Sequence, residues 1–149
     1  MRWFAIWVAV IGLSCFPLPI ALAASPSTVG ELLDGGGRQL TREDIPKLFA
    51  GATINGAAMG NANSTFQLRY LADGTATGEG RTQAGSTKIS GTWSANDRNQ
   101  YCQDLRTADG VPLQACFYYF VLGTRLYAAP TANRSAPVYE RQLTRETSR

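Results

Sequence analysis

The chain has 149 residues, of which 44% are hydrophobic and 17% charged, and its formal net charge at pH 7 is +3. A charge this balanced argues against a nucleic-acid-binding surface, and the length is that of one domain with a single core. The chain has no histidine, which removes the commonest general base and metal ligand from any candidate site.

The first 23 residues have the pattern of a secretory signal peptide. Arg2 precedes an apolar run over residues 5–16, and residues 21–24 supply an A-x-A cleavage site. A membrane anchor is the alternative, but Pro17 ends the run well short of the roughly 20 residues that cross a bilayer. We expect cleavage after Ala23, location in the periplasm or outside the cell, and no stable membrane anchor afterwards.

Cleavage would leave one domain with a segment at each end. We expect a flexible lead-in over residues 24–39, a single barrel domain over 40–143 and a basic tail over 144–149. Removal of residues 1–23 takes away Arg2 and no acidic residue, so the formal charge falls from +3 to +2. The C-terminal end is locally basic, which we interpret as a solvated, frayed end. Its arginines are Arg141, Arg145 and Arg149.

Two cysteines remain after cleavage, Cys102 and Cys116, and exported proteins meet oxidising conditions in which disulfides persist. A hairpin centred on residues 108–110 would place the two cysteines opposite each other, as a disulfide requires. The bridge would close a loop of about 15 residues, for which the chain-entropy model gives about 3 kcal/mol. Free thiols acting as a nucleophile or as metal ligands are the alternative, and they lack a histidine base and further ligands.

Residues 40–51 predict a short helix. Gly51 suits the left-handed position that ends a helix. Pro46 fits only in a first turn, so the helix can begin as late as Asp44. The apolar residues share one face, which we expect to plug the barrel or dock on its sheet. They are Ile45, Leu48 and Phe49.

From residue 52 onward the apolar pattern has a period of two, with turn signals about every eight to twelve residues. This pattern predicts a mainly all-β fold, an antiparallel meander of eight strands that forms a small barrel or a strongly curved sheet. Asp73-Gly74 and Gly123-Thr124 are turn signals, and glycines within strands indicate bulges or strong bends. These are Gly78, Gly80 and Gly91. The expected strands cover residues 52–59, 65–72, 75–81, 86–95, 100–105, 114–122, 125–129 and 138–143.

No catalytic arrangement is recognisable among the carboxylates and hydroxyls. Glu79 and Asp104 lie within predicted strands, and neither has a visible partner for acid and base chemistry. A nucleophilic serine would need Lys47 or Lys88 as its base, and the chain has no Ser-x-x-Lys arrangement. We therefore expect no enzyme, no metal site and no cofactor.

Aromatic residues are the candidates for binding. Tyr70, Trp93, Tyr101 and Tyr118 could line the mouth of a ligand pocket, because barrel interiors hold small apolar ligands. A filled core is the alternative, and eight strands favour it. Residues 116–121 are apolar on both faces, so we expect one face to cover the interior and the other to meet the 40–51 helix or a partner.

Several motifs follow one another in order along residues 40–127. They are Leu48-Phe49-x-Gly51-x-Thr53-x-x-Gly56, Tyr70-x-x-Asp73-Gly74-Thr75, Gly91-Thr92-Trp93 and the Cys102 and Cys116 pair. With them the chain resembles a family of small exported proteobacterial proteins of unknown function. The resemblance implies a periplasmic, lipocalin-like or related β fold and carries over no catalytic residue.

A weaker similarity is to periplasmic metalloprotease inhibitors, small disulfide-bonded barrels whose N-terminal segment enters the protease cleft. Residues 24–37 could act as that arm, although the helix at 41–50 between arm and barrel departs from the pattern. The function expected from the sequence is a non-enzymatic exported binding module for a small apolar ligand. The alternative is an envelope interaction protein or protease inhibitor that acts through its N-terminal arm or outer face.

Overall fold

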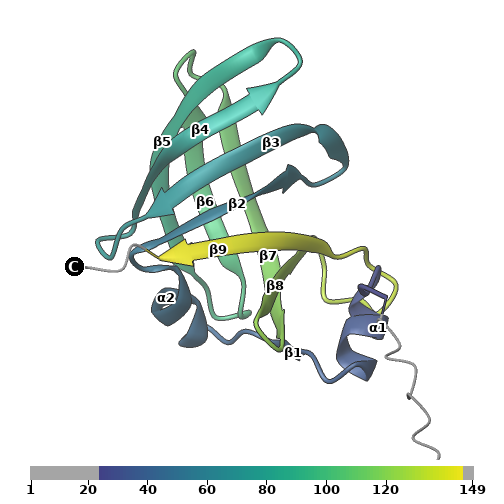
Figure 1. Cartoon of the computed structure of the whole chain (residues 1–149). Helices are drawn as coiled ribbons and strands as arrows, with labels where there is room; N and C mark the ends of the chain where they lie inside the picture. Colours follow the sequence, from purple (N-terminus) through teal and green to yellow (C-terminus); the bar gives the residue numbers. More distant parts are fainter. Residues whose placement is uncertain (1–23, 146–149) are drawn as a thin grey trace, which may run out of the picture.

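The computed structural model of the chain describes residues 24–145. The predicted signal peptide, residues 1–23, and residues 146–149 lie outside the described part. Two short helices and nine strands make up the fold (Figure 1). They are α1 Val29–Asp34, β1 Arg38–Gln39, α2 Asp44–Phe49, β2 Ala52–Ala58, β3 Asn61–Tyr70, β4 Thr75–Thr82, β5 Gly85–Ala95, β6 Tyr101–Thr107, β7 Pro112–Leu122, β8 Arg125–Ala129 and β9 Tyr139–Arg145. No helix in this part of the chain is long and apolar enough to span a membrane.

Strands β2 to β9 form a closed antiparallel barrel, as the eight-stranded pattern predicted. Neighbours in sequence pair from β2 to β9, and β9 pairs with β2 to complete the circle. The two-residue strand β1 lies outside this circle and pairs with β7 at Phe120 and Val121. The mainly β fold class is therefore confirmed, and β1 is the one strand that the pattern did not predict.

The disulfide joins the two strands on which it was predicted. Cys102 of β6 lies directly opposite Cys116 of β7, with their Cα atoms 4.0 Å apart. The hairpin turns where expected, because the Gly110 N–H donates to the Thr107 carbonyl over 2.9 Å.

The glycines of β4 and β5 do not shift the register of the sheet. A β-carbon on Gly78 would lie 1.9 Å from the carbonyl oxygen of Gln67, and one on Gly91 would lie 2.2 Å from that of Asp104. The ladder continues unbroken through both positions, so they are close approaches of backbone and not bulges. The register shift in this part of the barrel lies instead between Ala57 and Ala58 of β2.

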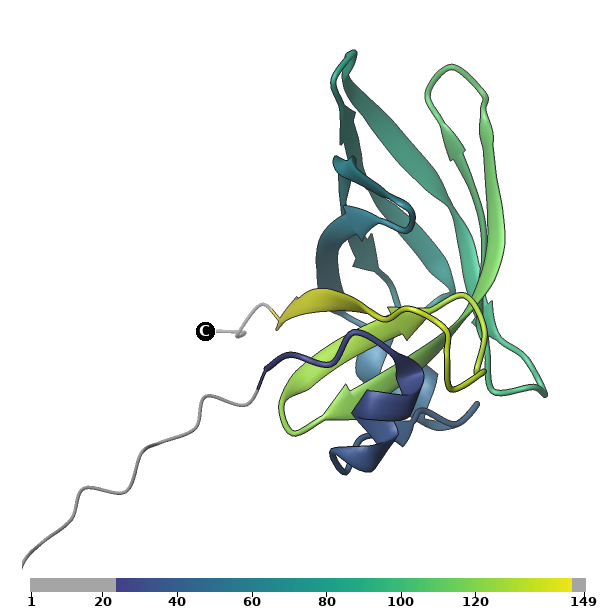
Figure 2. The same cartoon turned by 90° about the vertical axis from the view of Figure 1, so that its right-hand side faces the viewer.

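The barrel ladder is complete only at one end. Residues 56–58 of β2 pair with β3 alone, and residues 112–117 of β7 pair with β6 alone. At the level of these residues no backbone ladder links β2 to β7. Figure 2 shows the result, with the β4–β5 and β6–β7 hairpins standing apart above β8 and β9.

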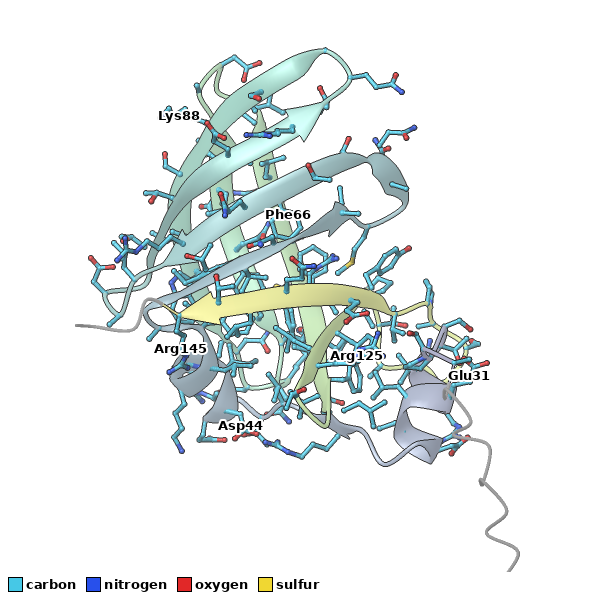
Figure 3. All side chains as sticks on the ribbon, in the orientation of Figure 1. Glu31, Asp44, Phe66, Lys88, Arg125 and Arg145 are labelled. Carbon is cyan, nitrogen blue, oxygen red and sulfur yellow. A yellow bond between two sulfur atoms is a disulfide. The ribbon has the colours of Figure 1, made fainter. Side chains whose placement is uncertain are left out.

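Helix α2 plugs the complete end of the barrel, as its apolar face predicted. It begins at Asp44, Ile45 and Phe49 are fully buried, and Gly51 follows with a φ of 76°. Arg145 at the end of β9 donates to the carbonyl oxygens of Lys47 and Leu48 over 2.8 and 2.9 Å, which ties the strand to the helix (Figure 3). β9 therefore extends two residues into the segment predicted as a basic tail.

The prediction of a flexible lead-in over residues 24–39 is wrong. This segment forms α1 and β1, and Val29 and Leu32 are fully buried against Phe120 and Tyr127 of the barrel wall. The outer apolar face of β7 is thus covered by α1 and not by the 40–51 helix. Local sequence gave little sign of α1 because a helix of six residues depends on such tertiary burial.

Candidate functional site

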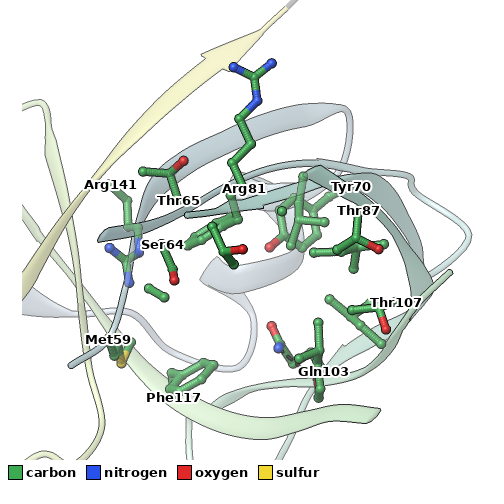
Figure 4. Close-up of a pocket in the computed structure, with 18 of the residues that line it drawn as sticks. Met59, Ser64, Thr65, Tyr70, Arg81, Thr87, Gln103, Thr107, Phe117 and Arg141 are labelled. Carbon is green, nitrogen blue, oxygen red and sulfur yellow. Dashed lines mark hydrogen bonds between the residues drawn. The ribbon is translucent and has the colours of Figure 1, made fainter. Parts of the chain in front are cut away.

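A cavity of about 470 Å³ lies at the end of the barrel where β2 and β7 each pair with one neighbouring strand alone (Figure 4). This volume falls within the roughly 300–1,000 Å³ that is typical of small-molecule sites. Most of the surface that the lining residues expose to the cavity is apolar. The apolar side chains are Ala58, Met59, Phe66, Leu68, Ile89, Leu105, Leu113 and Phe117, and the polar or amphipathic ones are Ser64, Thr65, Tyr70, Arg81, Thr82, Thr87, Gln103, Thr107, Tyr119 and Arg141.

Strand alternation explains why these residues meet. On β6, Gln103 and Leu105 face the lumen while Asp104 between them faces out, because successive strand residues point to opposite faces. On β7, Leu113 and Phe117 face in and Gln114 faces out, where its amide donates to Asp104 over 2.9 Å. The period of two therefore builds an apolar lumen inside a polar exterior.

The floor of the cavity is a cluster of packed rings centred on Phe49 of α2. Its ring centroid lies 4.9 to 5.9 Å from those of four barrel aromatics. These are Tyr70, Trp93, Tyr101 and Tyr119. Aromatic pairs at such distances contribute about 0.5–1.5 kcal/mol each beyond their burial. The floor is thus a filled core, while the lumen above it is open.

A short chain of hydrogen bonds links the floor to the cavity. The Tyr101 hydroxyl lies 3.2 Å from both the Tyr70 hydroxyl and Oε1 of Gln103, and the Gln103 amide donates to the Leu113 carbonyl over 3.1 Å. Burial raises the pKa of Tyr70 and that of Tyr101 far above their ordinary value. Both phenols therefore stay neutral at any physiological pH, and Gln103 presents a fixed amide at the cavity wall.

Arg141 is the one charged side chain of the described core. It lies on β9, is 4% exposed and lines the cavity. Its guanidinium carbon lies 5.2 Å from the ring centroid of Phe66 and 5.8 Å from that of Tyr139. Cation–π contacts of this kind contribute about 0.5–2 kcal/mol, whereas burying an ion leaves a penalty of several kcal/mol. The contacts with Phe66 and Tyr139 therefore offset only part of the free-energy penalty for burying this charge.

The hydrogen bonding of Arg141 is also incomplete. Nη1 donates to the backbone oxygen of Glu140 over 3.1 Å, but Nε is buried and has no acceptor among the described residues. Leaving a buried donor unpaired costs about 1–3 kcal/mol. Arg141 also interacts with Tyr119 on the floor: burial raises the pKa of Tyr119, and the positive charge of Arg141 and a hydrogen bond from its side chain both oppose that rise.

The structure places the four sequence-predicted binding residues in three settings. Tyr70 lines the cavity at its floor. Trp93 and Tyr101 lie in the ring cluster, where the Trp93 indole N–H lies 3.2 Å from the carbonyl oxygen of Leu71. Tyr118 lies on the opposite face of β7. It packs against the α1 cluster, the group of buried residues in which Val29 and Leu32 of α1 meet Phe120 and Tyr127. Only one of the four therefore contacts the open lumen.

Sequence reasoning missed the cavity wall itself and Arg141 above all. The interpretation of Arg141, Arg145 and Arg149 as a solvated, frayed end is wrong for Arg141, which is buried, and for Arg145, which lies in β9 and donates to two carbonyls of α2. The missed signal is the alternation in β9, which puts Arg141 on the same face as Leu143, a residue packed against the core.

The carboxylates considered for catalysis lie outside the lumen. Glu79 is partly exposed and lies 3.6 Å from Arg81, and Asp104 accepts a hydrogen bond from Gln114. Glu79 lines a second hollow of about 600 Å³. Its walls are Asn55, Gly56, Ala57, Thr65, Phe66, Gln67, Glu79, Arg81, Glu140 and Gln142. This lining is largely polar, unlike that of a small-molecule pocket.

Comparisons of the chain with protein-family models, with curated proteins and with solved structures found no match. The resemblance to an exported family stays a prediction, and the function must be argued from the cavity.

Proposed function

We propose that this chain is an exported, non-enzymatic binding protein whose barrel lumen takes a small, largely apolar ligand. The observation that carries the proposal is the cavity of about 470 Å³, walled by apolar side chains and floored by a rigid ring cluster. Ligand sites of this kind are concave, mostly apolar and marked by a few fixed polar groups. Gln103 and Arg141 supply such groups.

Two features make the lumen a better site than the outer surface. Residues 56–58 of β2 pair with β3 alone and residues 112–117 of β7 pair with β6 alone, so a ligand can enter between these two segments without breaking backbone hydrogen bonds. Large apolar side chains are rare on the described surface, where Leu71 and Val111 are the exposed ones. Two exposed apolar side chains give little support for an apolar docking patch on the outer face of residues 24–145.

The alternative, action on an envelope protein through an N-terminal arm, has less support. Val29 and Leu32 pack α1 onto the barrel, and Ser25 accepts a hydrogen bond from Arg125 over 2.9 Å. Residues 25–37 are thus part of the folded domain. Their deletion would uncover Phe120 and would not remove a free arm.

Binding of the neutral apolar dye N-phenyl-1-naphthylamine tests the proposal. We expect saturable one-site fluorescence enhancement with the mature protein. Leu113→Trp adds a large ring inside the cavity and should weaken dye binding by roughly tenfold or more, since the lumen volume is lost. Val111→Trp is the matched control, because Val111 is 50% exposed on the same hairpin and outside the cavity. Absence of saturation, or equal binding by both variants, would contradict the proposal.

A further inference from the structure

We propose that the lumen site is built for an amphiphile with a carboxylate head, which pairs with Arg141 while its apolar chain fills the cavity. This inference rests on the proposed function, since it names the chemical class of the ligand for the same site.

The first step is the absence of a counter-charge. No carboxylate of residues 24–145 forms an ion pair with Arg141. The adjacent Glu140 points to the other face of β9 and pairs with Arg125, with their side-chain atoms 2.5 Å apart. A buried charge is ordinarily paired, so the partner of Arg141 is expected to come from a ligand.

The second step is that the fold makes room for this arginine. A β-carbon on Gly56 would lie 2.8 Å from Nη1 and 2.9 Å from Cδ of Arg141. Gly56 follows Asn55, the last β2 residue that pairs with β9, so the guanidinium lies beside the part of β2 that pairs with β3 alone. The charge is therefore held at the side of the lumen from which a ligand head can approach.

The third step is the shape of the donor group. The guanidinium is a planar fork that matches a carboxylate with two parallel hydrogen bonds. Nε is one of the donors of that fork, and no atom of residues 24–145 accepts a hydrogen bond from it. In Figure 4 the guanidinium points into the cavity beside Ser64 and Met59. Ser64 could add a hydroxyl donor to the same head.

The fourth step is the placement of the tail. Figure 4 shows Arg141 and Met59 on one side of the cavity and Thr87 and Thr107 on the opposite side. Apolar walls connect the two sides, namely Phe66, Leu68, Ile89, Leu105, Leu113 and Phe117. A head bound at Arg141 therefore directs an alkyl chain across the lumen and along these walls. One charged end and an apolar remainder describe a fatty-acid-like amphiphile.

Competition against N-phenyl-1-naphthylamine tests the head group. The probes share one alkyl chain and differ at the head: dodecanoate, dodecanol, dodecylammonium and dodecyl phosphate. We expect dodecanoate to bind roughly tenfold or more tightly than dodecanol, and dodecylammonium to bind least, because a second cation would face Arg141. Equal affinity for dodecanoate and dodecanol overturns the inference. Tighter binding of dodecyl phosphate overturns the carboxylate assignment.

Two variants test whether Arg141 is the source of the preference for a carboxylate head. Arg141→Met keeps an unbranched apolar stem and removes the charge, so it should abolish the preference for dodecanoate over dodecanol. Arg81→Met is the matched control, because Arg81 lines the same cavity but its side chain is 70% exposed and lies near Glu79. A preference that survives Arg141→Met, or that is lost with Arg81→Met, overturns the inference. The head-group comparison in the unaltered protein needs no variant, so it stands even where Arg141→Met fails to fold.

The two proposals fail in different ways. If neither the dye nor any amphiphile binds, the proposed lumen function is wrong. If the dye and dodecanol bind with saturation but the carboxylate gives no advantage, the lumen function stands and the assignment of Arg141 is wrong.

Discussion

The ring of Phe49 meets the ring of Tyr119 edge to face, with their centroids 4.9 Å apart. Phe49 belongs to α2 and Tyr119 to β7, so this contact joins the helical plug to the barrel wall. Tyr119 also lines the cavity above, and the plug is therefore both the core of the fold and the floor of the candidate site.

Phe49→Ala should lower the free energy of unfolding by about 3–5 kcal/mol, the usual loss when a fully buried phenylalanine is truncated. Urea denaturation followed by Trp93 fluorescence measures it, since the indole lies 5.9 Å from the Phe49 ring. Phe117→Ala is the control, because Phe117 is only half buried and faces the open lumen. Equal losses in the two variants would show that α2 does not plug the barrel.

Removing the disulfide should destabilise the domain. Cys102 and Cys116 are 14 positions apart, for which the loop-closure model predicts a loss of about 3 kcal/mol. The double variant Cys102→Ser and Cys116→Ser should unfold at a lower urea concentration than the oxidised parent. Reductant should lower the stability of the parent to the same level and leave the variant unchanged. If reductant left the stability of the parent unchanged, the Cys102–Cys116 disulfide would be contradicted.

Two glycines of β4 should respond differently to alanine. Gly78→Ala forces a β-carbon against the Gln67 carbonyl and should destabilise the barrel by about 1–3 kcal/mol. Gly80→Ala meets only the flexible end of Ile89 at 3.0 Å and should be close to neutral. Thermal denaturation of both variants checks the difference. Similar melting temperatures would mean that β3 and β4 do not approach as closely as the structure has them.

The start of α2 should contribute to acid sensitivity. The Thr41 N–H and then the Arg38 guanidinium, both bonded to Asp44, lower the pKa of its carboxyl from 3.8 to about 2. A folded pKa below the unfolded value means that the contribution is present above about pH 4 and is lost as the pH falls toward 2.

Asp44→Asn should therefore be less stable than the parent at pH 6. At pH 2 the two proteins should be closer in stability. Denaturation at the two pH values measures this, and a carboxyl NMR titration reads the pKa directly. If the difference in stability between parent and variant grew as the pH fell, the pKa of Asp44 would not be lowered by folding.

The strands and the disulfide were predictable because both depend on regular spacing. The period of two identified all eight barrel strands, and the symmetric placement of Cys102 and Cys116 about residues 108–110 fixed their pairing. Helix α2 was predictable in the same way, since Pro46 and Gly51 fix its ends and its apolar residues share one face.

Helix α1 and the cavity were not predictable, because both depend on contacts between distant segments. Val29 and Leu32 are held by Phe120 and Tyr127 across the barrel wall, while the glycines that follow them resemble a linker. Whether the lumen is filled depends on where the ladders of β2 and β7 end, which no local pattern encodes. Arg141 is buried only because it faces that lumen.

Methyl NMR tests binding inside the lumen most directly. Protein labelled at isoleucine, leucine and valine methyl groups would be titrated with dodecanol. We predict saturable shifts at Ile89, Leu105 and Leu113, which line the cavity, and none at Val29 and Leu32, which belong to α1 and pack on the outside of the barrel. Shifts confined to the α1 cluster, or no saturable shift at the lumen methyl groups, would contradict a ligand site in the barrel.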